Sequence, residues 1–225
     1  MIRVVVFDFD GTLVDSNSVK EACLQAALAG IPGGAAALAS ARANGGNRYR
    51  VFAEVAKLVC PDEDMEQVAA LGRELAARYS RCCARGIIAA PERRRARQAL
   101  AILKRRGLRI WINSATPARH LPELLHRRDL ARFCDGALGG PRSKLDNLRH
   151  ILARERVTPR QMMMVGDGPD DCEAAHELGT WFVAITAEDR IGTPQRFAMR
   201  DLSGLVALID RLAPRPVERV ENSRR

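Results

Sequence analysis

Two carboxylates near the N-terminus, Asp8 and Asp10, have a spacing suited to chemistry. They follow an apolar run at residues 2–7 and precede Gly11-Thr12. In an extended strand, side chains two residues apart point to the same side. Both carboxylates are therefore expected on one side of the strand end. A site that holds a divalent cation and handles a phosphate needs such a pair.

Two other interpretations compete for this motif. Asp-x-Asp-Gly is also a turn signature, because Asp and Gly favour the local hydrogen bonds and backbone angles of turns. A calcium-binding loop would need an acid or Asn at its fifth position, Gly at its sixth and Glu at its twelfth. Those positions hold Thr12, Leu13 and Val19, which excludes the calcium loop. The choice between turn and active site depends on the rest of the chain.

Further polar groups follow other apolar runs. Ser114 comes after residues 108–113, Lys144 follows a Gly-Gly-Pro segment, and Asp167 and Asp171 follow residues 161–165. Each has a local structural explanation: a helix cap, an exposed lysine after a turn, and an acidic turn before a helix. Lys144 is one of only four lysines in an arginine-rich chain. Its use here indicates a compact charge suited to a phosphate oxygen.

The elements that would position these groups alternate between strand and helix. The expected strands are residues 2–7, 108–113, 161–165, 181–185 and 197–200, with a short one at 133–138. The expected helices between them are residues 92–106, 118–126, 145–156 and 171–178. Continuous apolar strands alternating with helices predict an α/β fold with a parallel sheet. Ligands of such sheets bind beyond the carboxyl ends of the strands, where these polar groups would meet.

One segment interrupts the alternation. Residues 18–85 contain no convincing strand and are expected to form helices at 19–28, 48–59 and 63–85. We therefore predict a core domain of residues 1–15 and 87–213, an inserted helical cap of residues 16–86, and a flexible tail of residues 214–225.

The composition limits the possible classes of protein. The 225 residues carry a net charge of +9, mostly as arginine spread along the expected helices, and only 4% are aromatic. Base stacking needs aromatic residues, so a nucleic-acid-binding module is a remote alternative. No apolar run is long enough to span a membrane, and the N-terminus lacks a signal-peptide layout, so a cytoplasmic protein is expected. The six cysteines form no Cys-x-x-Cys pair and are expected to be buried free thiols.

The motifs, in this order along the chain, resemble those of the haloacid dehalogenase-like (HAD) hydrolase superfamily. Asp8-Phe9-Asp10-Gly11-Thr12 looks like its first motif, Ser114 its second, Lys144 its third and residues 166–171 its fourth. The helical insertion looks like its type-1 cap. The resemblance implies a Rossmann-like parallel-sheet core with a mobile lid.

The resemblance also implies the roles of the residues. Asp8 would be the nucleophile and form an aspartyl phosphate, while Asp10 would protonate the leaving group and then activate water. Mg²⁺ would be held by the Asp8 side chain, the Asp10 backbone carbonyl and Asp167, with support from Asp171. Ser114 and Lys144 would bind phosphate oxygens. Asp170 is left out of the ligand set.

A narrower resemblance concerns capped members described as phosphoglycolate phosphatase-like. It rests on residues 14–20 and on Gly45-Gly46-Asn47-Arg48-Tyr49, and it makes Lys20 and Arg48 candidate substrate contacts. The acid at Asp10 disfavours dehalogenation. The sequence thus predicts a Mg²⁺-dependent phosphatase for a small phosphorylated metabolite. A sugar phosphomutase on the same scaffold is the alternative, and the oligomeric state stays open.

Overall fold

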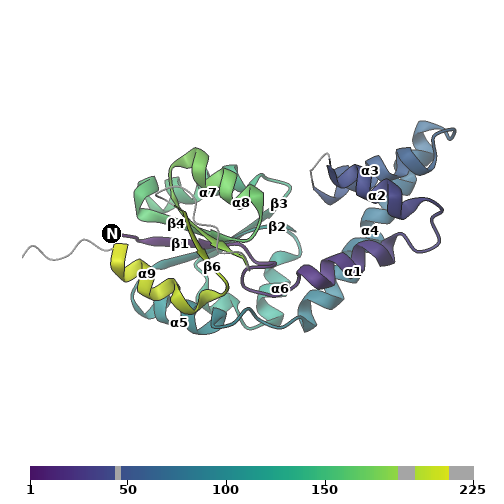
Figure 1. The fold of residues 1–225 in the computed structure, drawn as a ribbon. Helices are drawn as coiled ribbons and strands as arrows, with labels where there is room; N and C mark the ends of the chain where they lie inside the picture. Colours follow the sequence, from purple (N-terminus) through teal and green to yellow (C-terminus); the bar gives the residue numbers. More distant parts are fainter. Residues whose placement is uncertain (44–46, 187–195, 213–225) are drawn as a thin grey trace, which may run out of the picture.

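The computed structural model describes residues 1–43, 47–186 and 196–212 (Figure 1). The tail predicted at residues 214–225 lies outside the described residues. No helix in these ranges is long and apolar enough to cross a membrane.

The core is a parallel sheet, whose described strands follow the order β3-β2-β1-β4-β5-β6. The strands are β1 (Val4–Phe7), β2 (Arg109–Pro117), β3 (Gly136–Gly140), β4 (Met162–Gly166), β5 (Trp181–Ile185) and β6 (Arg196–Met199). The first strand therefore lies in the middle, between β2 and β4. Its carboxyl end adjoins the ends of both neighbours, and the predicted α/β parallel-sheet fold is confirmed.

Both faces of the sheet are covered by helices (Figure 1). Val5 and Phe7 of β1 belong to the core on one face, with α5 (Ala96–Arg105), α6 (Leu121–Arg127) and α9 (Leu205–Leu212). Val4 and Val6 pack on the other face with α7 (Lys144–Glu155) and α8 (Pro169–Leu178). All four β1 side chains are fully buried, which explains why this strand is continuously apolar.

The predicted helical insertion contains α1 (Asn17–Ala27), α2 (Gly34–Ala43), α3 (Arg48–Val59) and α4 (Met65–Ala89). Figure 1 shows these helices as a group standing beside the sheet layers, reached through α1 and α4. We call this group the cap. Helix α2 was not predicted from the sequence, because its run of alanines has little contrast between its faces. Helix α4 continues through residue 86, where the sequence placed the end of the cap.

Two strands differ from their predicted bounds. β2 was expected to end at residue 113 but continues to Pro117, with an irregular register against β3 after Asn113. A strand was expected at residues 133–138, but a 3₁₀ turn occupies Ala131–Phe133 and β3 begins at Gly136. A Cβ at Gly136 would overlap the Trp111 ring of β2. A glycine there allows the late-starting β3 to lie against β2.

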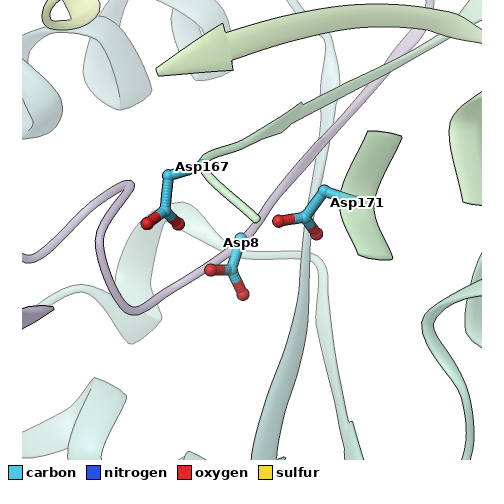
Figure 2. Close-up of side chains that lie close together, drawn as sticks. All are labelled: Asp8, Asp167 and Asp171. Carbon is cyan, nitrogen blue, oxygen red and sulfur yellow. The ribbon is translucent and has the colours of Figure 1, made fainter. Parts of the chain in front are cut away.

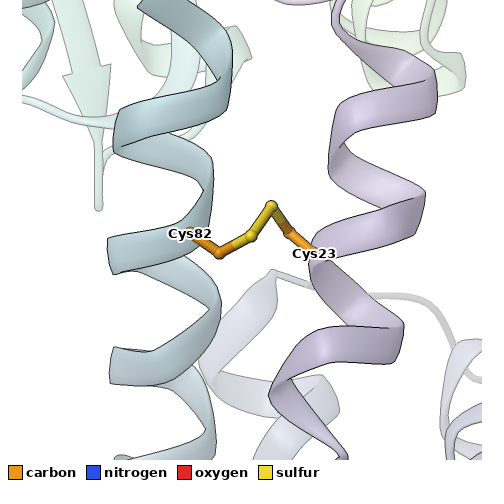
Figure 3. Close-up of a disulfide and its surroundings, with 2 residues drawn as sticks. All are labelled: Cys23 and Cys82. Atoms are coloured by element: carbon orange, nitrogen blue, oxygen red, sulfur yellow. A yellow bond between two sulfur atoms is a disulfide. The ribbon is translucent and has the colours of Figure 1, made fainter.

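The expectation of free thiols throughout is wrong for Cys23 and Cys82, which form a disulfide between α1 and α4 (Figure 3). Packing of these helices brings the two Cα atoms to 5.5 Å, within the usual range of about 4.4–6.8 Å. The pairing depends on tertiary packing, so spacing in the sequence does not reveal it. Cys60, Cys83, Cys134 and Cys172 are free.

Candidate active site

Three carboxylates meet at the carboxyl end of the sheet. Asp8 follows β1, Asp167 follows β4 and Asp171 lies in the first turn of α8. One oxygen of each lies within 4.8 Å of the others, and Figure 2 shows the three side chains next to one another. Carboxylate oxygens are the ligands that Mg²⁺ prefers, so this donor set fits that ion.

Gly11 allows the loop between β1 and α1 to approach this cluster. Its φ of +85° lies in the left-handed region, and a Cβ there would overlap the Asp167 carboxylate. Two side chains hold Asp167, one from this loop and one from the first residue of α1. Thr12 Oγ1 donates to one carboxylate oxygen at 3.2 Å, and Asn17 Nδ2 donates to the other at 2.8 Å. Neither side chain was predicted from the sequence to have a role in the site.

Lys144 joins two of the acids. Its Nζ lies 3.1 Å from Asp8 Oδ1 and 2.5 Å from Asp171 Oδ1, with Asp170 Oδ2 at 3.5 Å. The lysine is the first residue of α7, and Asn113 Nδ2 donates to its backbone carbonyl at 2.9 Å. Asn113 in β2 therefore fixes the start of α7, and with it the lysine beside the acids.

The electrostatics of this cluster follow from burial of like charges. Burial, then the charge of Asp171, raises the pKa of Asp8 well above its usual value, although Lys144 and Lys20 oppose the rise. Burial raises the pKa of Asp171 to about 7 despite Lys144. Burial alone would lower the pKa of Lys144, but the neighbouring carboxylates raise it overall. A bound divalent cation would relieve the repulsion among the acids.

Asp10 lies in a different environment from the three-acid cluster. Its Oδ1 accepts a hydrogen bond from Ser16 Oγ at 2.9 Å, and its Oδ2 accepts one from Thr116 Oγ1 at 3.0 Å. Lys20 Nζ lies 3.2 Å from the same Oδ2. The carboxylate is only 4% exposed, and these three side chains fix its orientation. Thr116 was missed because β2 was predicted to end before it.

Ser114 is buried, and its Oγ accepts a hydrogen bond from the Thr116 backbone N–H at 3.1 Å. The alternative role as a helix cap does not apply, since α6 begins only at Leu121 with His120 at its N-cap position.

The two cap residues proposed as substrate contacts, Lys20 and Arg48, face the core. Both line a cavity of 380 Å³ between the cap and the end of β2, together with Thr116 and Pro117. Arg48 also borders a second cavity of 620 Å³, which reaches Lys144 and Asp170. The structure thus brings both cap residues to the approach to the acids.

Comparisons with known proteins decide the family. The model of the haloacid dehalogenase-like hydrolase family matches residues 2–179. The chain belongs to this family. The match extends across the cap as well as the motifs at the strand ends. Together with the phosphoglycolate phosphatase relatives described next, it confirms the enzyme class predicted from the sequence, a HAD-like phosphoric monoester hydrolase.

Several relatives and solved structures resemble the chain. The phosphoglycolate phosphatase of Yersinia pseudotuberculosis is 30% identical over 193 residues, which cover 82% of this chain and 81% of the relative. That of Pseudomonas putida is 28% identical over 198 residues, covering 85% and 72%. A magnesium-bound crystal structure of the HAD hydrolase YfnB from Bacillus subtilis aligns with a TM-score of 0.69 and 15% identity. It covers 93% of this chain and 99% of YfnB, and confirms the fold.

Proposed function

We propose that the protein is a Mg²⁺-dependent phosphatase that hydrolyses a small phosphorylated metabolite through an aspartyl phosphate on Asp8. The observation that carries this proposal is the convergence of Asp8, Asp167 and Asp171, two of which, Asp8 and Asp171, also contact Lys144, beside a separately held Asp10. A nucleophile, a metal-ligand set, a phosphate-binding cation and a proton-transfer group therefore lie together.

The side chains of Asp8, Asp167 and Asp171 and the backbone carbonyl of Asp10 would hold Mg²⁺. When bound, the ion would keep Asp8 ionised and spread the charge of the phosphoryl group. Magnesium in the YfnB structure supports this choice of metal.

The chemistry of the chain's own residues has two steps. An Asp8 oxygen attacks phosphorus, the bond to the leaving oxygen breaks, and Asp10 donates its proton to that oxygen, which departs as the alcohol. Asp10 then takes a proton from a water molecule, which attacks the phosphorus of the aspartyl phosphate and releases phosphate and the Asp8 carboxylate. Lys144 and Ser114 hold the remaining phosphoryl oxygens, where fixed donors stabilise the charge of the transition state.

The cap, predicted at residues 16–86, would act as a lid that carries Lys20 and Arg48 to the substrate. Phosphoglycolate is the first substrate to examine, because the curated relatives are named for it. We place the protein in the cytoplasm, as proposed from its sequence. The Cys23–Cys82 disulfide is an observation against this placement, because disulfides are more usual in oxidising compartments.

Phosphate release from phosphoglycolate with Mg²⁺ tests this function. We expect release by the native protein and none by the Asp8→Asn variant. Arg50→Gln, which alters an exposed residue of α3, is the control and should retain activity. Full activity of Asp8→Asn would refute the mechanism. In a separate assay with a sugar phosphate as substrate, conversion to an isomeric sugar phosphate without release of free phosphate would favour the phosphomutase.

A further inference from the structure

The 380 Å³ cavity between the cap and the core lies beside Asp10, the proposed proton donor. Two of its lining residues, Lys20 and Thr116, contact the Asp10 carboxylate. The alcohol that Asp10 protonates would therefore occupy this cavity. Its volume falls within the range of about 300–1,000 Å³ that is usual for small-molecule sites.

The walls of the cavity are strongly cationic. They carry five lysine and arginine side chains, contributed by cap and core: Lys20, Arg48, Arg73, Arg81 and Arg119. No aspartate or glutamate is among the lining residues that the structure describes. A neutral leaving group would leave this charge without a counterpart.

Two of these cations already have acidic partners. Lys20 pairs with Asp10, and Arg81 lies 3.5 Å from a Glu74 carboxylate oxygen. Within the part of the chain that the structure describes, no ion pair joins Arg48, Arg73 or Arg119 to a carboxylate. Three arginines thus remain to hold an anion.

Arg48 is held in place before any ligand arrives. Its Nη1 donates to Ser80 Oγ at 3.4 Å, and its guanidinium lies 5.2 Å from the centre of the Tyr79 ring. Such contacts reduce the freedom that the side chain would lose on binding. Arg119 lines the same cavity from the core segment after β2.

The small hydroxyl side chains that line the cavity are already hydrogen-bonded within the protein. The Ser80 hydroxyl donates to the Ala76 carbonyl at 2.7 Å, and the Thr116 hydroxyl donates to Asp10. Much of the remaining wall is apolar, formed by Ala76, Ala77, Ala84, Ile87 and Leu124. The other polar side chains of the wall are the cations, with Tyr49 and His120.

We propose that the leaving alcohol of the substrate bears a second anionic group, a carboxylate or a phosphate, which Arg48, Arg73 and Arg119 bind. This inference rests on the proposed phosphatase function, since it concerns the leaving group of the same reaction. It assigns substrate recognition to cations of both the cap and the core.

Binding of matched phosphonates tests the subsite without any chemical step. Calorimetry in the presence of Mg²⁺ would compare ω-phosphonocarboxylates of two to five carbons with alkylphosphonates of equal length. Bisphosphonates of the same lengths would show whether a phosphate replaces the carboxylate. We expect at least one probe with two anionic groups to bind at least tenfold more tightly than its matched alkylphosphonate, which has only the phosphonate group.

The variants locate the subsite. Arg73→Gln and Arg119→Gln should each reduce the affinity advantage of the probe with the second anionic group. Arg119→Lys should retain part of that advantage, and Arg50→Gln should keep all of it. Arg50 lies on the same helix as Arg48 but lines neither cavity described above. Equal binding of all matched pairs, or a full advantage in the Arg73→Gln/Arg119→Gln double variant, would overturn the inference.

Hydrolysis of p-nitrophenyl phosphate, which has no second anion, separates the two proposals. If the native protein hydrolyses it but binds matched phosphonates equally, the phosphatase stands and the anion subsite fails. If the protein hydrolyses no phosphomonoester, the proposed function fails, while the phosphonate comparison still decides whether the arginines bind an anion.

Discussion

Lys20 Nζ lies 3.2 Å from Asp10 Oδ2, so the first helix of the cap contacts the proposed proton-transfer group of the core. Lys20 is 29% exposed and Asp10 is 4% exposed. Ser16 and Thr116 hold the same carboxylate from the loop before α1 and from β2. The position of the cap is therefore linked to the orientation of Asp10.

Replacing Lys20 with Met should slow the step that depends on Asp10. We expect kcat for an alkyl phosphate to fall about tenfold, the effect of losing about 1.4 kcal/mol of transition-state stabilisation. Hydrolysis of p-nitrophenyl phosphate should fall less, because its leaving group needs no proton. Lys57→Met changes an exposed cap lysine and serves as the control. Equal losses for both substrates would contradict a role through Asp10.

Asn17 should contribute to metal affinity without binding the ion itself. Its side chain donates to Asp167 Oδ2 at 2.8 Å and orients that carboxylate. Loss of such a supporting hydrogen bond weakens metal binding by about 10–100-fold. Calorimetric titration of Asn17→Ala with Mg²⁺ measures this, with the exposed neighbour Ser18→Ala as control. An unchanged dissociation constant for Asn17→Ala would show that Asp167 needs no such support.

The disulfide should stabilise the cap. Cys23 and Cys82 are 59 residues apart, and closing a loop of that length contributes about 4 kcal/mol to the free energy of unfolding in the chain-entropy account. Cys23→Ser should lower denaturant stability by an amount of that order, and reductant should produce a similar loss in the native protein. Cys60→Ser, a change at a free thiol, is the control. Finding six titratable thiols in the unreduced, unfolded chain would refute the bond.

The raised pKa of the buried Asp171 should make the free energy of unfolding depend on pH when no metal is bound. Its pKa rises from 3.8 to about 7 on folding, so the folded state binds more protons between these values. Its contribution to stability is then lost as the pH rises from about 4 to about 7. Asp171→Asn should remove this part of the slope, as seen in denaturant unfolding of metal-free protein at several pH values. The same slope in both proteins would contradict the prediction.

The sequence predicted the groups that follow strands β1, β3 and β4. Asp8, Lys144 and Asp167 were found because the carboxyl ends of parallel strands share one edge of the sheet. Thr116 and the contact of Lys20 with Asp10 were not foreseen. They depend on how far β2 continues and on how α1 packs against the core, which the local pattern of residues does not specify.

The same limit explains the other differences within the fold. Helix α2 lacks a clear apolar stripe, so its periodicity gave no signal. The Cys23–Cys82 bond follows from the packing of α1 against α4 rather than from cysteine spacing. Long, strongly patterned segments such as α3 were predicted with their observed bounds.

Trapping the phosphoryl group on Asp8 tests the central claim most directly. In the Asp10→Asn variant, p-nitrophenyl phosphate still has a leaving group that needs no proton, whereas hydrolysis of the intermediate lacks its base. We expect a burst of nitrophenolate close to one per enzyme, and mass spectrometry of the quenched protein should place one phosphoryl group on Asp8. Steady turnover with no burst and no phosphoryl group on Asp8 would contradict the account.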